Sequence, residues 1–260
     1  MEIFLTLLFK LIPLYLIIFL GYLAGRFLSV QKESIATVVI YILVPVIIFN
    51  GTATTPISIS TLSLPVLFFI LCCCMCLFFY FLGGFIWKDN TRNVLALAAG
   101  SANTGYFGIP VAIAFFDSHI VGLVTLATMG FQLFENTLGF FITAKGHHSA
   151  KEALLRVAKL PTVYAFFAGL AVNALGFQFG QIYSDTVILF RGAFTVLGMM
   201  IIGLGLANIR TYKFDYKFIT FSFFARFMIW PLVVLAVIAI DSALFKLYDK
   251  SIHTVMILMA

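Results

Sequence analysis

Long apolar stretches separated by short polar segments follow one another along the whole chain. A stretch of about 20 apolar residues is long enough for an α-helix to cross a hydrocarbon core of about 30 Å. No part of the chain has the composition of a soluble domain, so the pattern predicts an all-α polytopic membrane protein. It predicts eight spans and the beginning of a ninth, at Leu5–Phe27, Ser34–Ala53, Leu62–Trp87, Arg92–Phe116, Ile120–Ala144, Leu160–Phe177, Ser184–Asn208, Phe214–Ile240 and from Tyr248 onward.

Composition agrees with this pattern. Of the 260 residues, 63% are hydrophobic and 10% are charged, whereas an ordinary globular domain is about 25% charged. So few charges cannot cover the surface of a soluble fold, and the lipid bilayer is the expected solvent. The formal net charge of +6 does not call for a nucleic-acid partner, because the basic residues lie in the loops between apolar stretches.

The lysines and arginines alternate between loops. The loops after the even-numbered spans hold only Lys246 and Lys250, and eleven basic residues follow the odd-numbered spans. The positive-inside rule then places the central loop in the cytoplasm and the N-terminus outside. Because the central loop is short, we expect a multi-pass protein of the cell inner (plasma) membrane. The eleven residues are Arg26, Lys32, Lys88, Arg92, Lys145, Lys151, Arg156, Lys159, Arg210, Lys213 and Lys217.

The two halves of the chain resemble each other weakly. The first span (LIPLYLIIFLGYLAG) and the sixth (LPTVYAFFAGLAVNALG) each begin near a proline and end in glycines. A repeat of five spans is odd, so a second copy must be inverted in the membrane. This predicts a first five-helix repeat at 1–144, a cytoplasmic linker at 145–159 and a second, inverted repeat at 160–260. The second repeat holds only three spans and a fraction, so we expect the last spans to be missing from this chain.

The fourth predicted span, RNVLALAAGSANTGYFGIPVAIAFF, combines small residues with a proline. The small residues at 96–102 allow close approach of another helix. Pro110 removes a backbone donor and clashes with the carbonyl of Tyr106, which we expect to leave its helical bond. Unwound backbone inside a membrane must be buried in protein or line a wet cavity, where its polar groups bind a substrate or an ion. A packing kink is the alternative, and the polar pair Asn103 and Thr104 favours a site.

The motif SANTGYFGIPVAIAFF in this span resembles the fourth-span signature of the auxin efflux carrier family, which includes plant PIN exporters and bacterial malonate- and malate-type carriers. The segment GYLAGRFLSVQKESIATVVIYILVPVIIFNG is similar to the second-span region of the same family, and LPTVYAFFAGLAVNALG and GMMIIGLGLA also fit it.

This resemblance implies two inverted repeats of five transmembrane helices, as in NhaA and the bile-acid symporters. It also implies a helical scaffold, a transport bundle, and broken helices from the fourth and ninth spans that cross near the substrate. The chain ends at MILMA, where the second crossover proline would follow. The substrate-binding residues that the resemblance and the residue types suggest are Asn103, Thr104, Gly105, Gly108, Pro110, Asn50 and Pro45.

Charged residues inside spans are costly unless they are paired, protonated or wet. Glu135, in FQLFENTLG of the fifth span, is a candidate for proton coupling, or alternatively a packing partner of a basic residue. Arg226 in the eighth span is a candidate for binding an anionic substrate, because a guanidinium holds a carboxylate with two parallel hydrogen bonds. Its alternative is a salt bridge with Glu135. Arg191 in the seventh span has the same possible role, or snorkels toward the interface.

Other motifs indicate packing. The four cysteines, Cys72, Cys73, Cys74 and Cys76, lie in one apolar run and lack the spacing of a zinc site. We expect no metal and no cofactor. Gly21 and Gly25 form a GxxxG motif, which packs closely on a helix of the same chain or of a partner, so a homodimer stays open.

The expected function is a secondary transporter that exports or exchanges small organic anions, such as carboxylates or auxin-like weak acids, by alternating access. Coupling to H⁺ or Na⁺ is open. The alternatives are a sodium- or proton-coupled symporter of another solute, or a channel or receptor on the same scaffold. An enzyme is not expected, because the spans lack a catalytic pair such as serine with histidine, and no nucleotide-binding loop is present.

Overall fold

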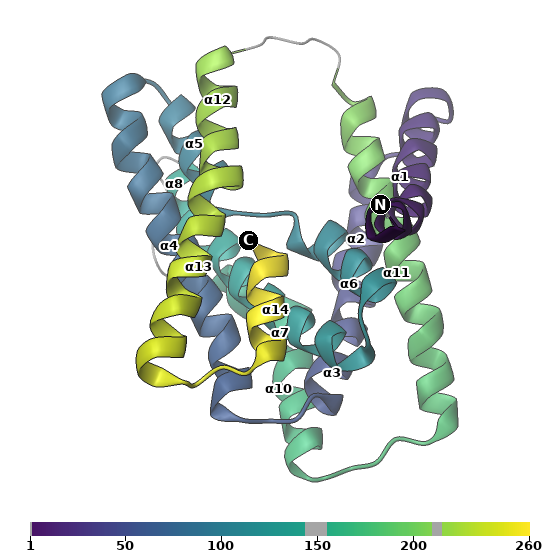
Figure 1. The fold of residues 1–260 in the computed structure, drawn as a ribbon. Helices are drawn as coiled ribbons and strands as arrows, with labels where there is room; N and C mark the ends of the chain where they lie inside the picture. Colours follow the sequence, from purple (N-terminus) through teal and green to yellow (C-terminus); the bar gives the residue numbers. More distant parts are fainter. Residues whose placement is uncertain (1, 144–154, 210–214) are drawn as a thin grey trace. The chain divides into compact units, whose positions relative to one another are not determined.

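The computed structural model describes residues 2–143, 155–209 and 215–260, and all regular elements in this part of the chain are helices (Figure 1). Most of the predicted linker at 145–159 lies outside the described residues, as do Arg210 and Lys213. The α-helices are α1 (Glu2–Phe27), α2 (Lys32–Val38), α3 (Val44–Thr54), α4 (Ile59–Ile86), α5 (Thr91–Gly100), α6 (Ile109–Phe115), α7 (Ser118–Phe134), α8 (Phe140–Thr143), α10 (Pro161–Ala174), α11 (Gln181–Ala207), α12 (Tyr216–Phe224), α13 (Trp230–Ile240) and α14 (Lys250–Met259). Five π-helical turns interrupt or extend them: η1 (Val39–Leu43), η2 (Thr104–Gly108), η3 (Glu135–Gly139), η4 (Ala225–Ile229) and η5 (Asp241–Phe245).

Five continuous helical stretches are long and apolar enough to cross a membrane. They correspond to the first, second, third, seventh and eighth predicted spans, which supports an all-helical, multi-pass membrane protein. The remaining predicted spans correspond to α5 with α6, α7 with α8, α10 and α14. The five stretches are Leu8–Phe27, Lys32–Thr54, Ile59–Ile86, Gln181–Ala207 and Tyr216–Phe245.

A π-helical turn precedes each of three prolines, Pro45, Pro110 and Pro231, which lie at the start of α3, α6 and α13. A proline ring lacks an N–H group and clashes with the carbonyl four residues earlier. In these helices the residue before the proline donates instead to the carbonyl five residues earlier, which widens the turn next to the ring. The three bonds run from Val44 to Val39, from Ile109 to Thr104 and from Trp230 to Ala225.

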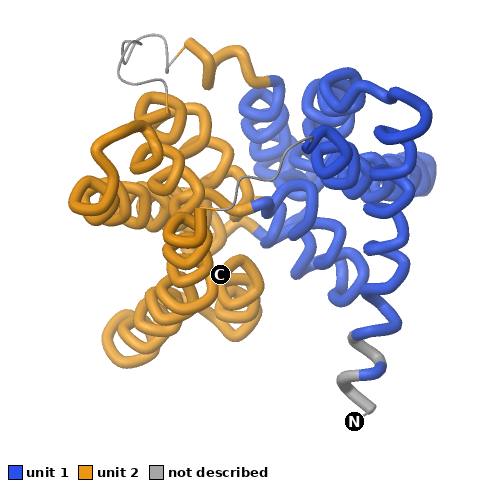
Figure 2. The backbone as a smooth tube through the Cα atoms, turned by 90° about the horizontal axis from the view of Figure 1, so that it is seen from above, with its two compact units in different colours: residues 1–56, 103–125, 161–212 blue, residues 57–102, 126–160, 213–260 orange. Residues whose placement is uncertain are grey.

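The chain forms two compact units (Figure 2). The first consists of residues 1–56, 103–125 and 161–212, and the second of residues 57–102, 126–160 and 213–260. The first unit therefore contains the first, second, sixth and seventh predicted spans. Each unit takes segments from both predicted repeats, and the chain passes between the units at 56–57, 102–103, 125–126, 160–161 and 212–213.

In the first unit, α1 packs along α11 through glycines. A Cβ atom added to Gly21 would lie 2.7 Å from the Cα of Met200, and one added to Gly203 would overlap the Ile18 carbonyl. A Cβ added to Gly25 would lie 2.8 Å from that of Ala207. The GxxxG motif thus packs against a helix of the same chain, where small residues let the two backbones approach closely.

A second close pair in this unit is α3 with α10. A Cβ added to Gly169 would lie 2.8 Å from the carbonyl oxygen of Phe49. One turn further along α10, the Asn173 amide donates hydrogen bonds to the carbonyl oxygens of Thr52, Ala53 and Thr55, at 3.0, 2.9 and 2.8 Å. These carbonyls belong to the end of α3, where helical partners run out, so Asn173 caps that helix from a neighbouring one.

In the second unit, aromatic residues and a glycine join α4, α7 and α13. A Cβ added to Gly130 would lie 2.8 Å from the backbone nitrogen of Phe69, so α7 and α4 touch at their backbones. The Phe131 ring lies 5.2 Å from that of Phe68 and stacks at 6.1 Å on that of Trp230. The side chains of Phe68, Phe131 and Trp230 are all fully buried, so this cluster forms the core of the unit.

Two of the four cysteines belong to the same core. Cys72 and Cys76 are fully buried on α4, and a Cβ added to Gly100 would lie 2.8 Å from the Cβ of Cys76. In the described part of the chain the four cysteines are free, and no group of histidine, cysteine and carboxylate side chains has the arrangement of a metal site. Cys72 and Cys76 act as small packing residues.

Candidate functional site

The chain leaves helical conformation at Ser101–Asn103, between α5 and η2. The Ser101 N–H group donates to the Leu97 carbonyl at 2.8 Å and closes the last turn of α5. The indole N–H group of Trp230 donates to the Ala99 carbonyl at 2.6 Å. A carbonyl at a helix end has no helical donor, so Trp230 satisfies one of the groups that the end of α5 leaves open.

The non-helical residues lie seven to nine positions before Pro110, earlier than the unwinding expected around that proline. The π-helical turn explains the difference, because it accommodates Pro110 while the backbone stays helical from Thr104 onward. The Asn103 carbonyl accepts from the N–H groups of Phe107 and Gly108, at 3.1 and 3.3 Å, and opens this new helical segment. The segment that starts at Thr104 thus has its N-terminal end next to an exposed Asn103.

That helix start has the chemistry of an anion site. The first N–H groups of a helix have no intrahelical acceptors, and the helix dipole makes this end positive. Helix starts of this kind favour a carboxylate or a phosphate. Thr104 is buried, and a Cβ added to Gly105 would meet no atom of the described residues within 4 Å. On the other side, Tyr106 packs against Gly198 of α11, which leaves the Gly105 side of the turn open.

The structure places Asn50 and Pro45 in α3 of the same unit. Asn50 is buried, and its side-chain oxygen accepts a hydrogen bond from the Tyr183 hydroxyl at 3.1 Å. The Tyr183 ring stacks on Phe179 at 3.8 Å. Arg191 lies two turns along α11 from Tyr183 and has a buried Nε atom without a partner among the described residues. Asn50 is thus joined to α11, and this helix also contacts η2.

Glu135 belongs to the second unit, where it begins η3. Its carboxylate accepts a hydrogen bond from the Ser101 hydroxyl. Asn136 donates to the Gln132 carbonyl within its own helix, at 2.9 Å, and the Gln132 side-chain oxygen is buried without a partner in the described part of the chain. Glu135 therefore has a neutral donor as its partner.

Arg226 also lies in the second unit, in η4. Its guanidinium lies 5.3 Å over the Trp230 ring, and its Nη1 atom is buried without a hydrogen-bond partner among residues 2–143, 155–209 and 215–260. Within those residues it forms no ion pair with Glu135. The alternative of a Glu135–Arg226 salt bridge is not seen, and the half-buried guanidinium keeps a buried donor, Nη1, without a partner among the described residues.

The suggested site residues therefore fall into two groups. Those of the first unit are Asn103, Thr104, Gly105, Gly108, Pro110, Asn50 and Pro45, and those of the second are Glu135 and Arg226. The two groups are linked by neighbouring positions in the sequence. Ser101, the partner of Glu135, is two residues from Asn103, and the unit boundary lies between them.

The sequence does not reveal the role of Asp241. The eighth span is predicted to end at Ile240, but the helical stretch continues to Phe245 and Asp241 is buried. Its carboxylate accepts from the backbone N–H groups of Leu247 and Tyr248 and contacts His253 Nε2, at 3.0, 3.2 and 3.1 Å. This carboxylate closes the turn between α13 and α14. An aspartate followed within 15 residues by a lone histidine is too common a pattern to signal such a turn.

Comparison with known proteins agrees with the motif in the fourth span. A family model described as "Membrane transport protein" matches residues 6–152, which contain the first five predicted spans and that motif. The chain belongs to this family, the auxin efflux carrier family. Its similarity to the uncharacterized transporter MJ1031 of Methanocaldococcus jannaschii is 25% identity over 228 residues, which is 83% of this chain and 74% of that protein. Family and relative both indicate a membrane transporter and not an enzyme.

Proposed function

We propose that this member of the membrane transport family is a secondary transporter of small organic anions, such as carboxylates or auxin-like weak acids. One observation carries the proposal: the non-helical residues Ser101–Asn103 coincide with a boundary between the two compact units. A transporter that works by alternating access moves one body relative to another around its site. Backbone at such a junction changes its environment during the movement. Here the junction is followed directly by the positive N-terminal end of the helical segment that begins at Thr104.

The residues have separate roles in this proposal. Asn103 offers amide donors, and the backbone N–H groups from Thr104 onward stabilise the negative charge of the substrate. Gly105 lets a carboxylate approach the backbone because its Cβ position is empty. Gly108 ends the π-helical turn η2, and this turn accommodates Pro110 at the start of α6, which holds this helix start in place. Arg226 provides a guanidinium for the same class of substrate.

The first unit is the proposed scaffold, since the first, second, sixth and seventh predicted spans all belong to it. Asn50 and Pro45 belong to this unit and support the helix start through α11. The second unit is the proposed transport bundle. Two inverted repeats, at 1–144 and 160–260, with broken helices near the substrate remain part of the proposal, as does an N-terminus outside the cell inner (plasma) membrane.

Proton coupling through Glu135 is the proposed energy source. The carboxylate is exposed, and its partner Ser101 lies next to the non-helical segment. Loss of the negative charge weakens a charge-assisted hydrogen bond, so protonation of Glu135 loosens the end of α5. Sodium coupling would instead predict that uptake responds to a sodium gradient and not to a pH gradient. The experiment below distinguishes the two.

The test is uptake of radiolabelled malonate, malate and indole-3-acetate into proteoliposomes that contain the full chain, with an imposed pH or sodium gradient. We expect saturable uptake of at least one anion, which Asn103→Ala abolishes. Asn208→Ala is the matched control, because Asn208 is an exposed residue at the end of α11. Flux that rises linearly with concentration would indicate a channel. Absence of uptake of every anion by folded protein would refute the organic-anion assignment.

A further inference from the structure

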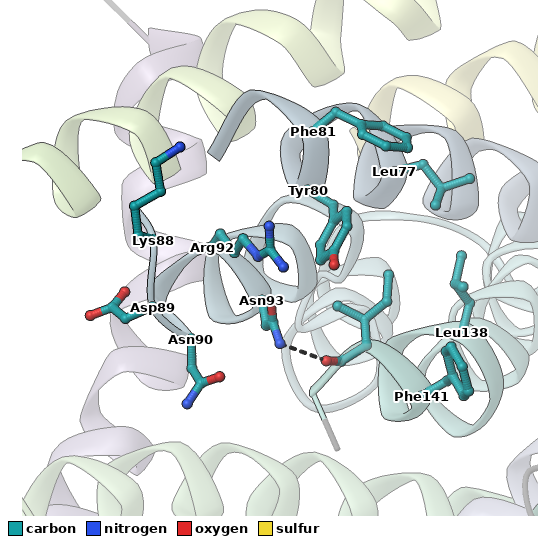
Figure 3. A pocket seen from close by; sticks show the side chains of 11 residues that line it. Leu77, Tyr80, Phe81, Lys88, Asp89, Asn90, Arg92, Asn93, Leu138 and Phe141 are labelled. Carbon is teal, nitrogen blue, oxygen red and sulfur yellow. Dashed lines mark hydrogen bonds between the residues drawn. The ribbon is translucent and has the colours of Figure 1, made fainter. Parts of the chain in front are cut away.

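A pocket of about 480 Å³ lies in the second unit, between the end of α4, the start of α5 and α8 (Figure 3). One part of its lining is apolar, with Leu77, Phe81 and Phe141. The other part is polar, with Lys88, Asp89 and Arg92. The apolar part lies within helices, whereas Lys88 lies two residues beyond the end of α4 at Ile86. The lining thus changes from apolar to basic at the end of a membrane span.

The basic residues of this pocket are available to an anion. The Arg92 guanidinium lies 4.8 Å over the Tyr80 ring and, within the described residues, has no carboxylate partner (Figure 3). The Lys88 ammonium donates to the Gly84 carbonyl at 3.2 Å and keeps two further donors. Both side chains make short local contacts and line the same pocket.

The one acidic residue of the pocket is engaged by its neighbour. The Asp89 carboxylate accepts a hydrogen bond from the Thr91 backbone N–H group at 3.0 Å. Hydrogen bonds from the side chain and the backbone of Thr91 lower the pKa of Asp89. The carboxylate therefore stays ionised at neutral pH, and the pocket carries one net positive charge from Lys88, Arg92 and Asp89.

A hydrogen bond between α5 and α8 fixes the two helices that line one side of the pocket. The Asn93 side-chain amide donates to the Ile142 carbonyl at 3.0 Å, which ties α5 to α8 (Figure 3). Asn93 is buried, so water does not compete for this bond. The lining residues on either side of it are held in place, and the ordering cost of binding is reduced.

We propose that this pocket binds an anionic phospholipid, with its phosphate at Lys88 and Arg92 and an acyl chain along Leu77, Phe81 and Phe141. The exposed Phe81 and Phe141 rings, at 66% and 42% of their full surface, provide the apolar track that an acyl chain follows. Basic pockets between membrane helices on the cytoplasmic side suit lipid head groups. A small anion such as inorganic phosphate shares the head-group chemistry but leaves the apolar track empty.

The test uses the full chain purified in a neutral detergent and measures binding of phosphatidylglycerol by native mass spectrometry, with phosphatidylcholine as the neutral lipid. We expect preferential retention of phosphatidylglycerol. Because each basic residue near a membrane surface contributes about 1 kcal/mol of attraction to anionic lipid, Lys88→Ala should weaken binding about fivefold. Asp89→Asn keeps the acceptor for Thr91 but removes the negative charge, so it should strengthen binding by a similar factor.

Lys217→Ala is the matched control, since Lys217 is an exposed lysine of α12 outside the pocket lining. It should leave the preference unchanged. An equal loss in Lys217→Ala and Lys88→Ala would indicate general surface charge and overturn the proposal. Displacement of the bound lipid by millimolar inorganic phosphate, as effective as displacement by added phosphatidylglycerol, would also overturn the proposal. It would assign the pocket to small anions. The gain in Asp89→Asn cannot come from misfolding, so it keeps the test decisive if Lys88→Ala is unstable.

Discussion

The Ser101 hydroxyl donates a hydrogen bond to the Glu135 carboxylate across 34 positions of sequence. Ser101 is the first residue after α5, and Glu135 is the first residue of η3. The only acidic group in the fifth predicted span is thus joined to the segment that leaves helical conformation. A bond of this kind responds to protonation, because a neutral carboxyl group is a weaker acceptor than a carboxylate.

Glu135→Gln should remove proton coupling and leave the fold intact. The glutamine side-chain oxygen can still accept from Ser101, but it cannot bind or release a proton. We expect exchange of substrate at equal pH to persist, whereas stimulation of uptake by an imposed pH gradient is lost. The measurement is the initial rate of uptake into proteoliposomes with and without the gradient.

Two further variants control this experiment. Asp185→Asn removes an exposed carboxylate on α11 whose partner is Gln181, and it should keep the full gradient response. Ser101→Ala removes the donor and should change the pH at which coupling is half-maximal. A response to the pH gradient that survives in Glu135→Gln would show that the coupled proton binds at another residue.

The spans were predictable because the length and hydropathy of an apolar stretch are enough to indicate a transmembrane helix. α4 runs from Ile59 to Ile86 where Leu62–Trp87 is predicted, and α11 from Gln181 to Ala207 where Ser184–Asn208 is predicted. Family membership was also predictable, because the fourth-span motif is contiguous. It is confirmed by the family model over residues 6–152.

Partners in space were not predictable from one sequence. Ser101 reads as one more small residue, and only packing of α5 beside η3 brings its hydroxyl to Glu135. Trp230 reads as an apolar residue before a proline, yet it donates to the end of α5. The π-helical turn before Pro110 depends on a bond from Ile109 to Thr104 that hydropathy does not encode. The substrate-binding residues themselves stay a prediction.

Gly203→Ala should destabilise the first unit. A Cβ at this position would overlap the Ile18 carbonyl and the backbone of Gly21, and backbone cannot move aside as a flexible side chain does. Overpacking of this kind costs about 1–3 kcal/mol or more. We expect a lower midpoint of thermal unfolding in detergent, followed by intrinsic fluorescence.

Gly192→Ala in the same helix is the control, because an added Cβ there meets no atom within 4 Å in the part of the chain that the structure describes. An alanine is preferred to a glycine inside a helix by roughly 0.5–1 kcal/mol, so this variant should be as stable as the parent or more so. Equal midpoints for the two variants would contradict the close crossing of α1 and α11.

Asn173→Ala should loosen the end of α3. The substitution leaves three carbonyl oxygens, those of Thr52, Ala53 and Thr55, without their shared donor. Loss of a partner for a buried polar group costs about 1–3 kcal/mol. We expect faster hydrogen–deuterium exchange at the end of α3 and at the start of α10. Asn136→Ala is the control, because among the described residues its amide donates only to the Gln132 carbonyl, one turn earlier. The same exchange pattern in both variants would argue against a cap.

Asp241→Ala should unfasten the turn between α13 and α14. The change removes the acceptor of the Leu247 and Tyr248 N–H groups and the contact with His253. Hydrogen bonds to a charged group contribute about 1.5–3 kcal/mol each, and part of that energy is recovered if water reaches the donors. We therefore expect a loss of thermal stability together with earlier proteolysis between α13 and α14. Asp241→Asn keeps one acceptor oxygen, so its thermal stability should lie between those of the parent protein and Asp241→Ala. Asp215→Ala removes the cap of α12 at Phe218 and should cost about 1 kcal/mol. If Asp241→Ala costs no more than Asp215→Ala, the carboxylate does not organise this turn, and its burial needs another cause.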